Sequence, residues 1–193
     1  MRRVVFVDVE TGGLDPRGDA LLEIGAVSGC GRFTANYFVS PEGRRVCEGA
    51  FKVNGIDVAG AEFVENALSR KWAAAHFSDF LAECGVDEQG WVLAGMNPSF
   101  DRAFLMSLWR ETGERFPKPG HRCLDLHSLA CGDWFMREGW AGEVPAFYSD
   151  AISECLAMEP EAKPHRALAG AKWARECAMR FCCAEELGER GER

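Results

Sequence analysis

The sequence predicts an α/β fold in which a five-stranded mixed sheet carries helices on both faces. Three strand-like segments come first, and helix-like and strand-like segments alternate after them. Three consecutive strands favour an antiparallel meander, and the alternation that follows favours further strands joined through helices. The first strand, residues 3–10, is almost continuously apolar, which is typical of a central strand covered on both sides.

The other strands are predicted from apolar runs between turn residues. Residues 20–28 and 32–39 flank the turn Gly29-Cys30-Gly31, a pattern that indicates a hairpin. Shorter apolar segments predict the last two strands at residues 91–94 and 122–124.

Helices are predicted where apolar residues such as Phe77 and Phe80 recur at three- and four-residue spacing. Asn97 and Pro98 mark one helix start, because Asn is a favoured N-cap and Pro is tolerated at the first helical position. The predicted helices span residues 46–53, 66–84, 98–111, 125–137, 146–158 and 165–187.

Composition predicts one domain over residues 1–187 with a polar tail over 188–193. The net charge of −8 argues against a broad basic surface for nucleic acid, but not against a small groove around metal ions. No apolar run is long enough to span a bilayer. Nine scattered cysteines without a Cys-x-x-Cys pair fit a reducing compartment. We therefore expect a cytoplasmic protein that does not associate with membranes.

Two carboxylates, Asp8 and Glu10, lie two residues apart at the end of the first predicted strand. Side chains with this spacing point to the same face of a sheet. Two carboxylates beside a core repel each other and are costly to bury, and a divalent cation relieves that cost. Oxygen ligands of this kind suit Mg²⁺ or Mn²⁺. An acidic strand end that simply meets solvent is the alternative.

Two further polar residues stand at predicted helix starts. Asp101 falls in the first turn of the helix after Pro98, where the helix dipole alone would favour an acid. His165 opens the last predicted helix, where a lone histidine is usually structural or solvated. Neither residue by itself indicates a catalytic site. The order of Asp8, Glu10, Asp101 and His165 along the chain does indicate one.

Six segments carry this order: Asp8-Val9-Glu10-Thr11-Gly12, Leu22-Glu23-Ile24-Gly25-Ala26-Val27, Val53-Asn54-Gly55-Ile56, Gly95-Met96-Asn97-Pro98-Ser99-Phe100-Asp101, Cys123-Leu124-Asp125-Leu126-His127-Ser128-Leu129-Ala130 and His165-Arg166-Ala167-Leu168-Ala169. Together they resemble the DEDDh, or DnaQ-like, 3′-to-5′ exonucleases. That superfamily includes the proofreading subunit of bacterial DNA polymerase III and ribonuclease T. The likeness spans residues 3 to 180, and Asn54 stands where the family usually has histidine.

The resemblance implies a ribonuclease H-like fold and a two-metal phosphodiesterase that releases nucleoside monophosphates from single-stranded DNA or RNA 3′ ends. Asp8, Glu10 and Asp101 would then bind Mg²⁺ or Mn²⁺, at two sites or at one, and His165 would act as general base. The sequence does not give the oligomeric state, and the resemblance makes a homodimer a reasonable assembly. The implied substrate-binding residues are Thr11, Gly12, Leu14, Asn54, Asn97 and Phe100. Most tryptophans and phenylalanines are expected in the core; for Trp134 and Trp140 the alternative is stacking on bases or lining an interface.

Gly170 departs from the family pattern, because it occupies the position of the fourth carboxylate. Three explanations stay open: catalysis has been lost or weakened, another segment such as Asp150 or Glu154 supplies the ligand, or the sequence is a deliberately inactivated variant. The sequence therefore predicts an exonuclease impaired by Gly170. The alternative is an exonuclease-fold module that is catalytically weak or inactive and binds nucleic-acid 3′ ends or a protein partner.

Overall fold

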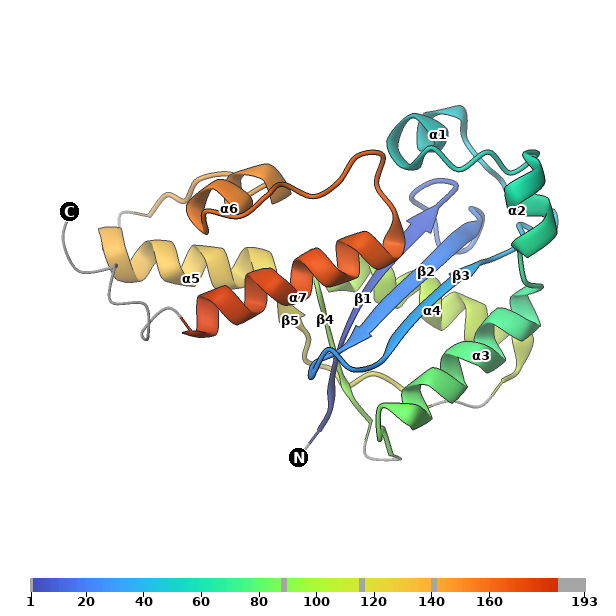
Figure 1. Cartoon of the computed structure of the whole chain (residues 1–193), viewed down its shortest axis with the longest axis horizontal. Coiled ribbons are helices and arrows are strands. Elements are labelled where there is room, and N and C mark those ends of the chain that lie inside the picture. Colours follow the sequence, from blue (N-terminus) through green and yellow to red (C-terminus); the bar gives the residue numbers. More distant parts are fainter. Residues whose placement is uncertain (1, 88–89, 115–116, 140–141, 184–193) are drawn as a thin grey trace.

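A five-stranded mixed sheet forms the centre of the molecule (Figure 1). The computed structural model describes residues 2–87, 90–114, 117–139 and 142–183. In the sheet order β3-β2-β1-β4-β5, β1, β2 and β3 are antiparallel neighbours, and β4 and β5 run parallel to β1. The predicted meander, hairpin and central first strand are confirmed. The strands are β1 (Val4–Thr11), β2 (Leu21–Ser28), β3 (Thr34–Phe38), β4 (Val92–Gly95) and β5 (Leu124–Asp125).

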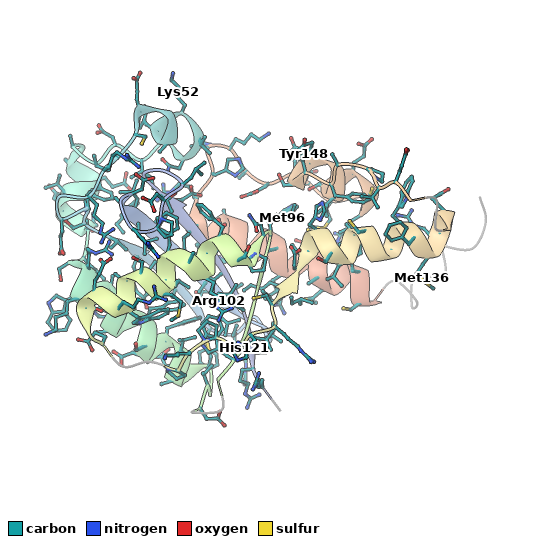
Figure 2. The ribbon with its side chains drawn as sticks, turned by 180° about the vertical axis from the view of Figure 1, so that it is seen from behind. Lys52, Met96, Arg102, His121, Met136 and Tyr148 are labelled. Atoms are coloured by element: carbon teal, nitrogen blue, oxygen red, sulfur yellow. The ribbon has the colours of Figure 1, made fainter. Side chains whose placement is uncertain are left out.

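Helices cover both faces of the sheet. In Figure 1, α7 crosses the front of the sheet, and Figure 2 shows α4, with Arg102, crossing it from behind. One hydrophobic core lies between the sheet and α3 and α4, and another lies between the sheet and α5, α6 and α7. The helices are α1 (Glu48–Asn54), α2 (Ala61–Asn66), α3 (Arg70–Glu83), α4 (Pro98–Thr112), α5 (Leu126–Glu138), α6 (Ser149–Cys155) and α7 (Ala167–Cys183).

The alternation of side chains along β1 decides where its carboxylates point. Val5, Val7 and Val9 belong to the core under α3 and α4, whereas Phe6 belongs to the core under α7. Since successive side chains of a strand point to opposite faces, the even-numbered residues of β1 face α7. Asp8 and Glu10 therefore share the α7 face, as their spacing predicts.

The start of α7 is fixed against β2. The buried Glu23 accepts two hydrogen bonds of 3.0 Å from the Arg166 guanidinium and one of 3.1 Å from the Ala167 amide. Gly25 lies under the same turn, where a Cβ would overlap the backbone of Ala167 and Leu168. Only glycine permits this approach, so the sequence Glu23-Ile24-Gly25 sets how α7 lies on the sheet.

Several predicted helix boundaries were wrong. The predicted helix 66–84 begins only at Arg70, because the Ser69 hydroxyl caps it by accepting from the Trp72 amide. The short helix α2 was not predicted. The predicted helix 146–158 shortens to Ser149–Cys155, and α7 begins at Ala167 rather than at His165. The predicted tail, 188–193, and the domain end at 187 lie outside the described residues.

Two further findings concern the described ranges as a whole. No helix there combines the length and the apolar character that crossing a membrane requires. The cysteines whose side chains are described are free thiols.

Candidate metal and active site

Three of the predicted site residues meet where β1 runs past the end of β4. The last paired residues of these two strands are Phe6 and Ala94, and Asp8 and Glu10 lie beyond them on β1. Asp101, in the first turn of α4, is buried, and its Oδ1 accepts a 2.9 Å hydrogen bond from the Val9 amide. This bond ties the carboxylate of α4 to the backbone between the two carboxylates of β1.

Burial and mutual repulsion make these carboxylates costly to ionise. Burial raises the pKa of Glu10 to about 7 and that of Asp101 to about 8, with like charges adding to both. The pKa of Asp8 is raised well above its usual range, first by burial and then by the charges of Asp101 and Glu10. A bound cation would favour all three charged forms, because an opposite charge lowers a carboxyl pKa.

The donor chemistry of these residues fits a divalent cation, since carboxylate oxygens are hard ligands. However, within the described ranges no three His, Cys, Asp or Glu side chains already surround a point where a metal ion could sit. The backbone therefore brings the carboxylates into electrostatic reach, and binding an ion would require their side chains to turn toward it.

His165 stands at the same edge, just before α7. Its amide donates to the Val53 carbonyl at 3.2 Å, and its Nδ1 lies 3.0 Å from Oε1 of Glu161. The imidazole also lies near enough to Glu10 for a positive charge on it to lower the Glu10 pKa. The structure thus brings His165 to the carboxylates.

Gly170 lies on the face of α7 that meets Asp8, and it is buried. The donors suggested by the sequence do not replace its missing carboxylate. Asp150 is exposed and pairs with Lys163 at 3.0 Å, and Glu154 is also exposed. A residue that the sequence analysis missed, Glu161, is the acidic side chain beside Gly170.

The predicted substrate-binding residues near β1 are divided between buried and exposed positions. Gly12 is buried, and a Cβ there would lie 2.6 Å from the Arg45 carbonyl oxygen, so the loop after β1 requires glycine. Asn54 is buried and donates to the Thr11 carbonyl at 3.2 Å, which holds this loop. Leu14, by contrast, is 83% exposed at the loop tip, where a ligand could meet it.

The other two predicted substrate-binding residues, Asn97 and Phe100, lie at the start of α4. Asn97 occupies the N-cap position in a left-handed conformation, but its side chain makes no capping bond. Its Oδ1 accepts instead from the Ser99 hydroxyl at 2.7 Å. Phe100 is half-buried, with its ring 5.0 Å from that of Phe104. The predicted cap is thus correct in position and wrong in mechanism.

The remaining aromatic candidates lie elsewhere. Trp134 is partly buried in the core beneath α7, and its ring lies 6.3 Å from that of Phe147. That contact gives it a packing role. Trp140 lies outside the described residues.

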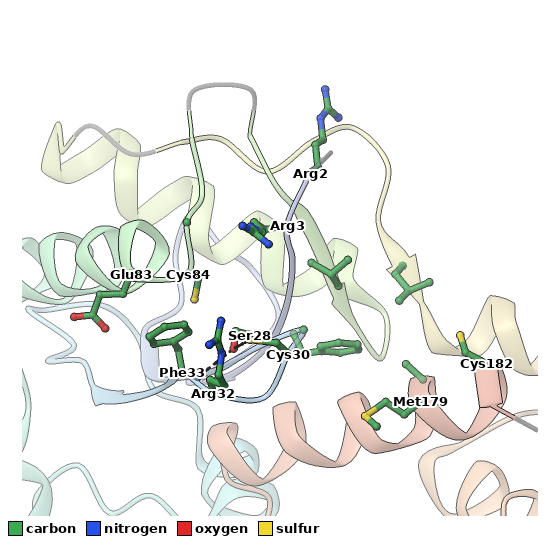
Figure 3. Close-up of a pocket in the computed structure, with 16 residues that line it drawn as sticks. Arg2, Arg3, Ser28, Cys30, Arg32, Phe33, Glu83, Cys84, Met179 and Cys182 are labelled. Atoms are coloured by element: carbon green, nitrogen blue, oxygen red, sulfur yellow. Dashed lines mark hydrogen bonds between the residues drawn. The ribbon is translucent and has the colours of Figure 1, made fainter.

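A cavity of about 580 Å³ opens near the other end of β1, far from Asp8 and Glu10 along the strand (Figure 3). Arg2, Arg3 and Arg32 line it together with apolar side chains such as Phe33 and Met179. It contains none of the predicted site residues, so this cavity is separate from the candidate site.

Comparison with known proteins agrees with the motifs. Residues 5–125, more than half of the chain, match the family model for the RNase_T exonucleases. The chain belongs to this exonuclease family. This confirms the predicted membership of the DnaQ-like 3′-to-5′ exonuclease superfamily.

Within the exonuclease family, ribonuclease T of Haemophilus influenzae strain PittGG is 30% identical over 142 residues, covering 65% of this chain and 59% of the relative. The ribonuclease T of strain Rd is 29% identical over the same length. The chain therefore spans about 59% of the length of these relatives.

Solved structures confirm the ribonuclease H-like fold. The zinc-bound form of the E. coli exonuclease I complex with single-stranded DNA matches with a TM-score of 0.77 at 16% identity, over 97% of this chain and 42% of that one. E. coli exonuclease I with a dT13 oligonucleotide matches with a TM-score of 0.74 at 16% identity, over 95% and 41%.

Proposed function

We propose that this chain is a metal-dependent 3′-to-5′ exonuclease that acts on single-stranded DNA or RNA ends and releases nucleoside monophosphates. One observation carries the proposal: in a member of the exonuclease family, Asp8, Glu10, Asp101 and His165, from three separate segments of the chain, lie at one edge of the sheet. Edges where parallel strands end are common places for ligands in α/β sheets.

Asp8, Glu10 and Asp101 would hold Mg²⁺ or Mn²⁺. Two ions are expected, and a single ion is the alternative. When bound, such ions lower the pKa of a coordinated water and stabilise charge on the leaving oxygen. Asp101 would remain oriented by the Val9 amide, and Glu10 by the neighbouring Asn54 amide. These contacts limit how far the two carboxylates can turn.

His165 would accept the proton of the attacking water. Its Nδ1 is engaged by Glu161, which leaves Nε2 as the nitrogen that takes the proton. The side chain is 29% exposed, so the ring can reach both solvent and the carboxylate edge. A histidine suits this task because its ordinary pKa lies near neutrality.

The test is a time course with 5′-labelled single-stranded DNA and RNA oligonucleotides in Mn²⁺. The proposal predicts a ladder of products shortened from the 3′ end, which EDTA abolishes and a blocked 3′ hydroxyl slows. Intact substrate of both kinds after prolonged incubation, with correctly folded protein, would contradict it.

A second candidate function follows from Gly170: a module that binds 3′ ends or a protein partner without cleaving. It predicts saturable oligonucleotide binding, weakened by Asp8→Ala, with no shortened product in any divalent cation. The same gel and a filter-binding titration separate the two functions. A homodimer, a cytoplasmic location and the 1–187 domain boundary stay predictions.

A further inference from the structure

Gly170 faces two carboxylates rather than open space. A Cβ built at Gly170 would overlap Oδ2 of Asp8 and would lie 3.0 Å from Oε1 of Glu161. Both oxygens therefore lie within 3.0 Å of one point beside the α7 backbone. The volume that a side chain at 170 would begin to fill is occupied by acidic oxygens from two other segments.

Glu161 reaches this point from the irregular segment between α6 and α7. Its side chain is only 11% exposed, although the residue lies outside any helix or strand. Its carboxylate is near enough to Asp8 and Glu10 for its charge to oppose ionisation of both. Glu161 is thus a member of the same acidic cluster, facing it from the side of α7.

The contacts of Glu161 leave capacity for a ligand. Its Oε1 lies 3.0 Å from Nδ1 of His165, and a carboxylate has about four acceptor positions in all. Two surface depressions of about 590 and 600 Å³ also border Glu161. Glu161 therefore borders open space at the surface.

Other acidic side chains nearby are committed elsewhere. Glu23 is bound by the Arg166 guanidinium, and Asp150 is paired with Lys163 at the surface. Glu159 and Glu154 are exposed. These contacts leave Glu161 as the acid best placed to act beside Asp8.

We propose that Glu161 takes the place of the carboxylate that Gly170 lacks, and completes with Asp8, Glu10 and Asp101 a set of four oxygen ligands for divalent cations. The inference rests on the proposed function. In this arrangement the fourth ligand has moved from α7 to the segment before it, and glycine at 170 keeps the space clear for both carboxylates.

The test measures binding of Mn²⁺ alone to EDTA-treated full-length protein, by electron paramagnetic resonance of the free ion. Glu161→Gln preserves size and hydrogen bonding to His165 but removes the charge; Glu159→Gln is the matched control in the same segment. We expect Glu161→Gln to weaken Mn²⁺ affinity at least about 10-fold, because loss of even an indirect partner of a metal site costs that much. Glu159→Gln should bind as the original protein does.

A second variant separates the loss of a metal ligand from any other effect of Glu161→Gln on the site. Adding Gly170→Asp to Glu161→Gln should restore part of the lost affinity, because the new carboxylate starts from the same point. Unchanged Mn²⁺ binding in Glu161→Gln, with only a shifted pH–rate profile, would show that Glu161 merely orients His165 and would overturn the inference.

The outcomes distinguish the inference from the proposed function. If Asp8→Asn abolishes Mn²⁺ binding and Glu161→Gln does not change it, the inference fails and the proposed function stands. If the original protein binds no Mn²⁺ and cleaves no oligonucleotide, the proposed function fails and the inference falls with it.

Discussion

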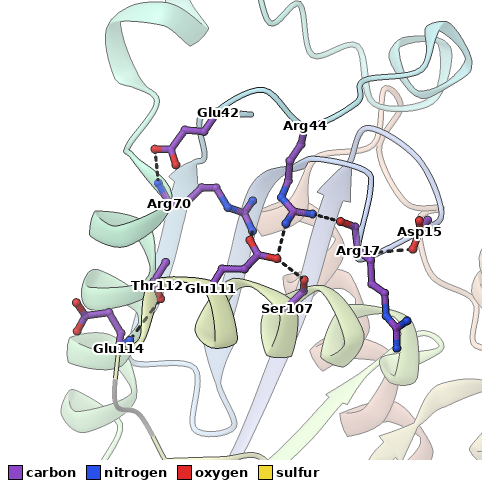
Figure 4. A network of polar contacts seen from close by, with 9 residues as sticks. All are labelled: Asp15, Arg17, Glu42, Arg44, Arg70, Ser107, Glu111, Thr112 and Glu114. Atoms are coloured by element: carbon purple, nitrogen blue, oxygen red, sulfur yellow. Dashed lines mark hydrogen bonds and ion pairs between the residues drawn. The ribbon is translucent and has the colours of Figure 1, made fainter.

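Two acidic regions of this molecule differ in how their charge is balanced. Around Glu111, on α4, the protein supplies the cations: Arg44 and Arg70 both pair with its carboxylate, and the Ser107 hydroxyl donates to it at 2.9 Å (Figure 4). At the end of β1, Asp8, Glu10 and Asp101 have no Arg or Lys ion pair among the contacts of the described chain.

Under the proposed function, this difference separates carboxylates that stabilise packing from carboxylates that bind a metal ion. The network around Glu111 joins α4 to α3 and to the loop that holds Arg44, so its charges stabilise packing. The cluster on β1 concentrates like charges, and burial raises their pKa values. Under the proposed function, a divalent cation from outside the protein would supply the positive partner of this cluster.

The largest expected effect comes from removing a charge at the β1 cluster. Asp8→Asn should lower the Mn²⁺-dependent cleavage rate at least about 100-fold, because losing a direct ligand costs more than losing a supporting one. Cleavage of labelled oligonucleotide measures the effect. Glu111→Gln is the matched control and should change the rate less than about twofold, because Glu111 is not one of the proposed metal ligands. Equal losses in both variants would contradict the comparison.

The reverse effect is expected on stability. Glu111→Gln should lower the free energy of unfolding by roughly 2 kcal/mol, between the values for exposed and buried ion pairs. Arg70 is 8% exposed and would be left without its charged partner. Urea denaturation in EDTA measures the loss. In the same EDTA-containing buffer, Asp8→Asn should leave the free energy of unfolding unchanged or raise it. A large loss of stability in Asp8→Asn would instead show that the β1 carboxylate stabilises the fold.

The pH dependence of stability should also divide the two regions. The folded pKa values of about 7 for Glu10 and 8 for Asp101 lie above those of the unfolded chain. The folded protein therefore binds protons more tightly, and the stability contributed by these groups is lost as pH rises from about 4 to 8. Melting of EDTA-treated protein between pH 6 and 8 should show this decline, and Asp101→Asn should flatten it. A decline as steep in Asp101→Asn as in the original protein would assign it to other groups.

The smallest effect is expected at an exposed pair. Asp150 and Lys163 are 59% and 61% exposed, so Asp150→Asn should change the free energy of unfolding by less than about 1 kcal/mol. Mn²⁺ affinity should stay as in the original protein. A clear loss of Mn²⁺ binding in Asp150→Asn would move the fourth ligand from Glu161 to this pair.

Much of the site could be predicted because it follows from short-range rules. The two-residue spacing of Asp8 and Glu10 fixes a shared face on a strand, and Pro98 fixes where α4 and therefore Asp101 begin. The glycine turn at residues 29–31 fixes the β2–β3 hairpin. In each case a few neighbouring residues determine the geometry.

Glu161 and Glu23 could not be assigned in this way, because their roles depend on contacts with distant segments. Glu161 lies in an irregular segment without periodicity, and only the packing of α7 against β1 brings it to Asp8. Glu23 acts through Arg166, which is 143 residues away along the chain. Gly25 indicated that another segment approaches β2 closely, but the sequence did not show that this segment is the start of α7.

The most direct measurement of the central claim is anomalous X-ray scattering from crystals grown with Mn²⁺ at about pH 8. We predict manganese peaks at the end of β1, with carboxylate oxygens of Asp8, Glu10 and Asp101 turned onto them. Crystals without manganese there, or with manganese bound only at other acidic surfaces, would contradict the claim that this edge of the sheet is built to hold a metal ion.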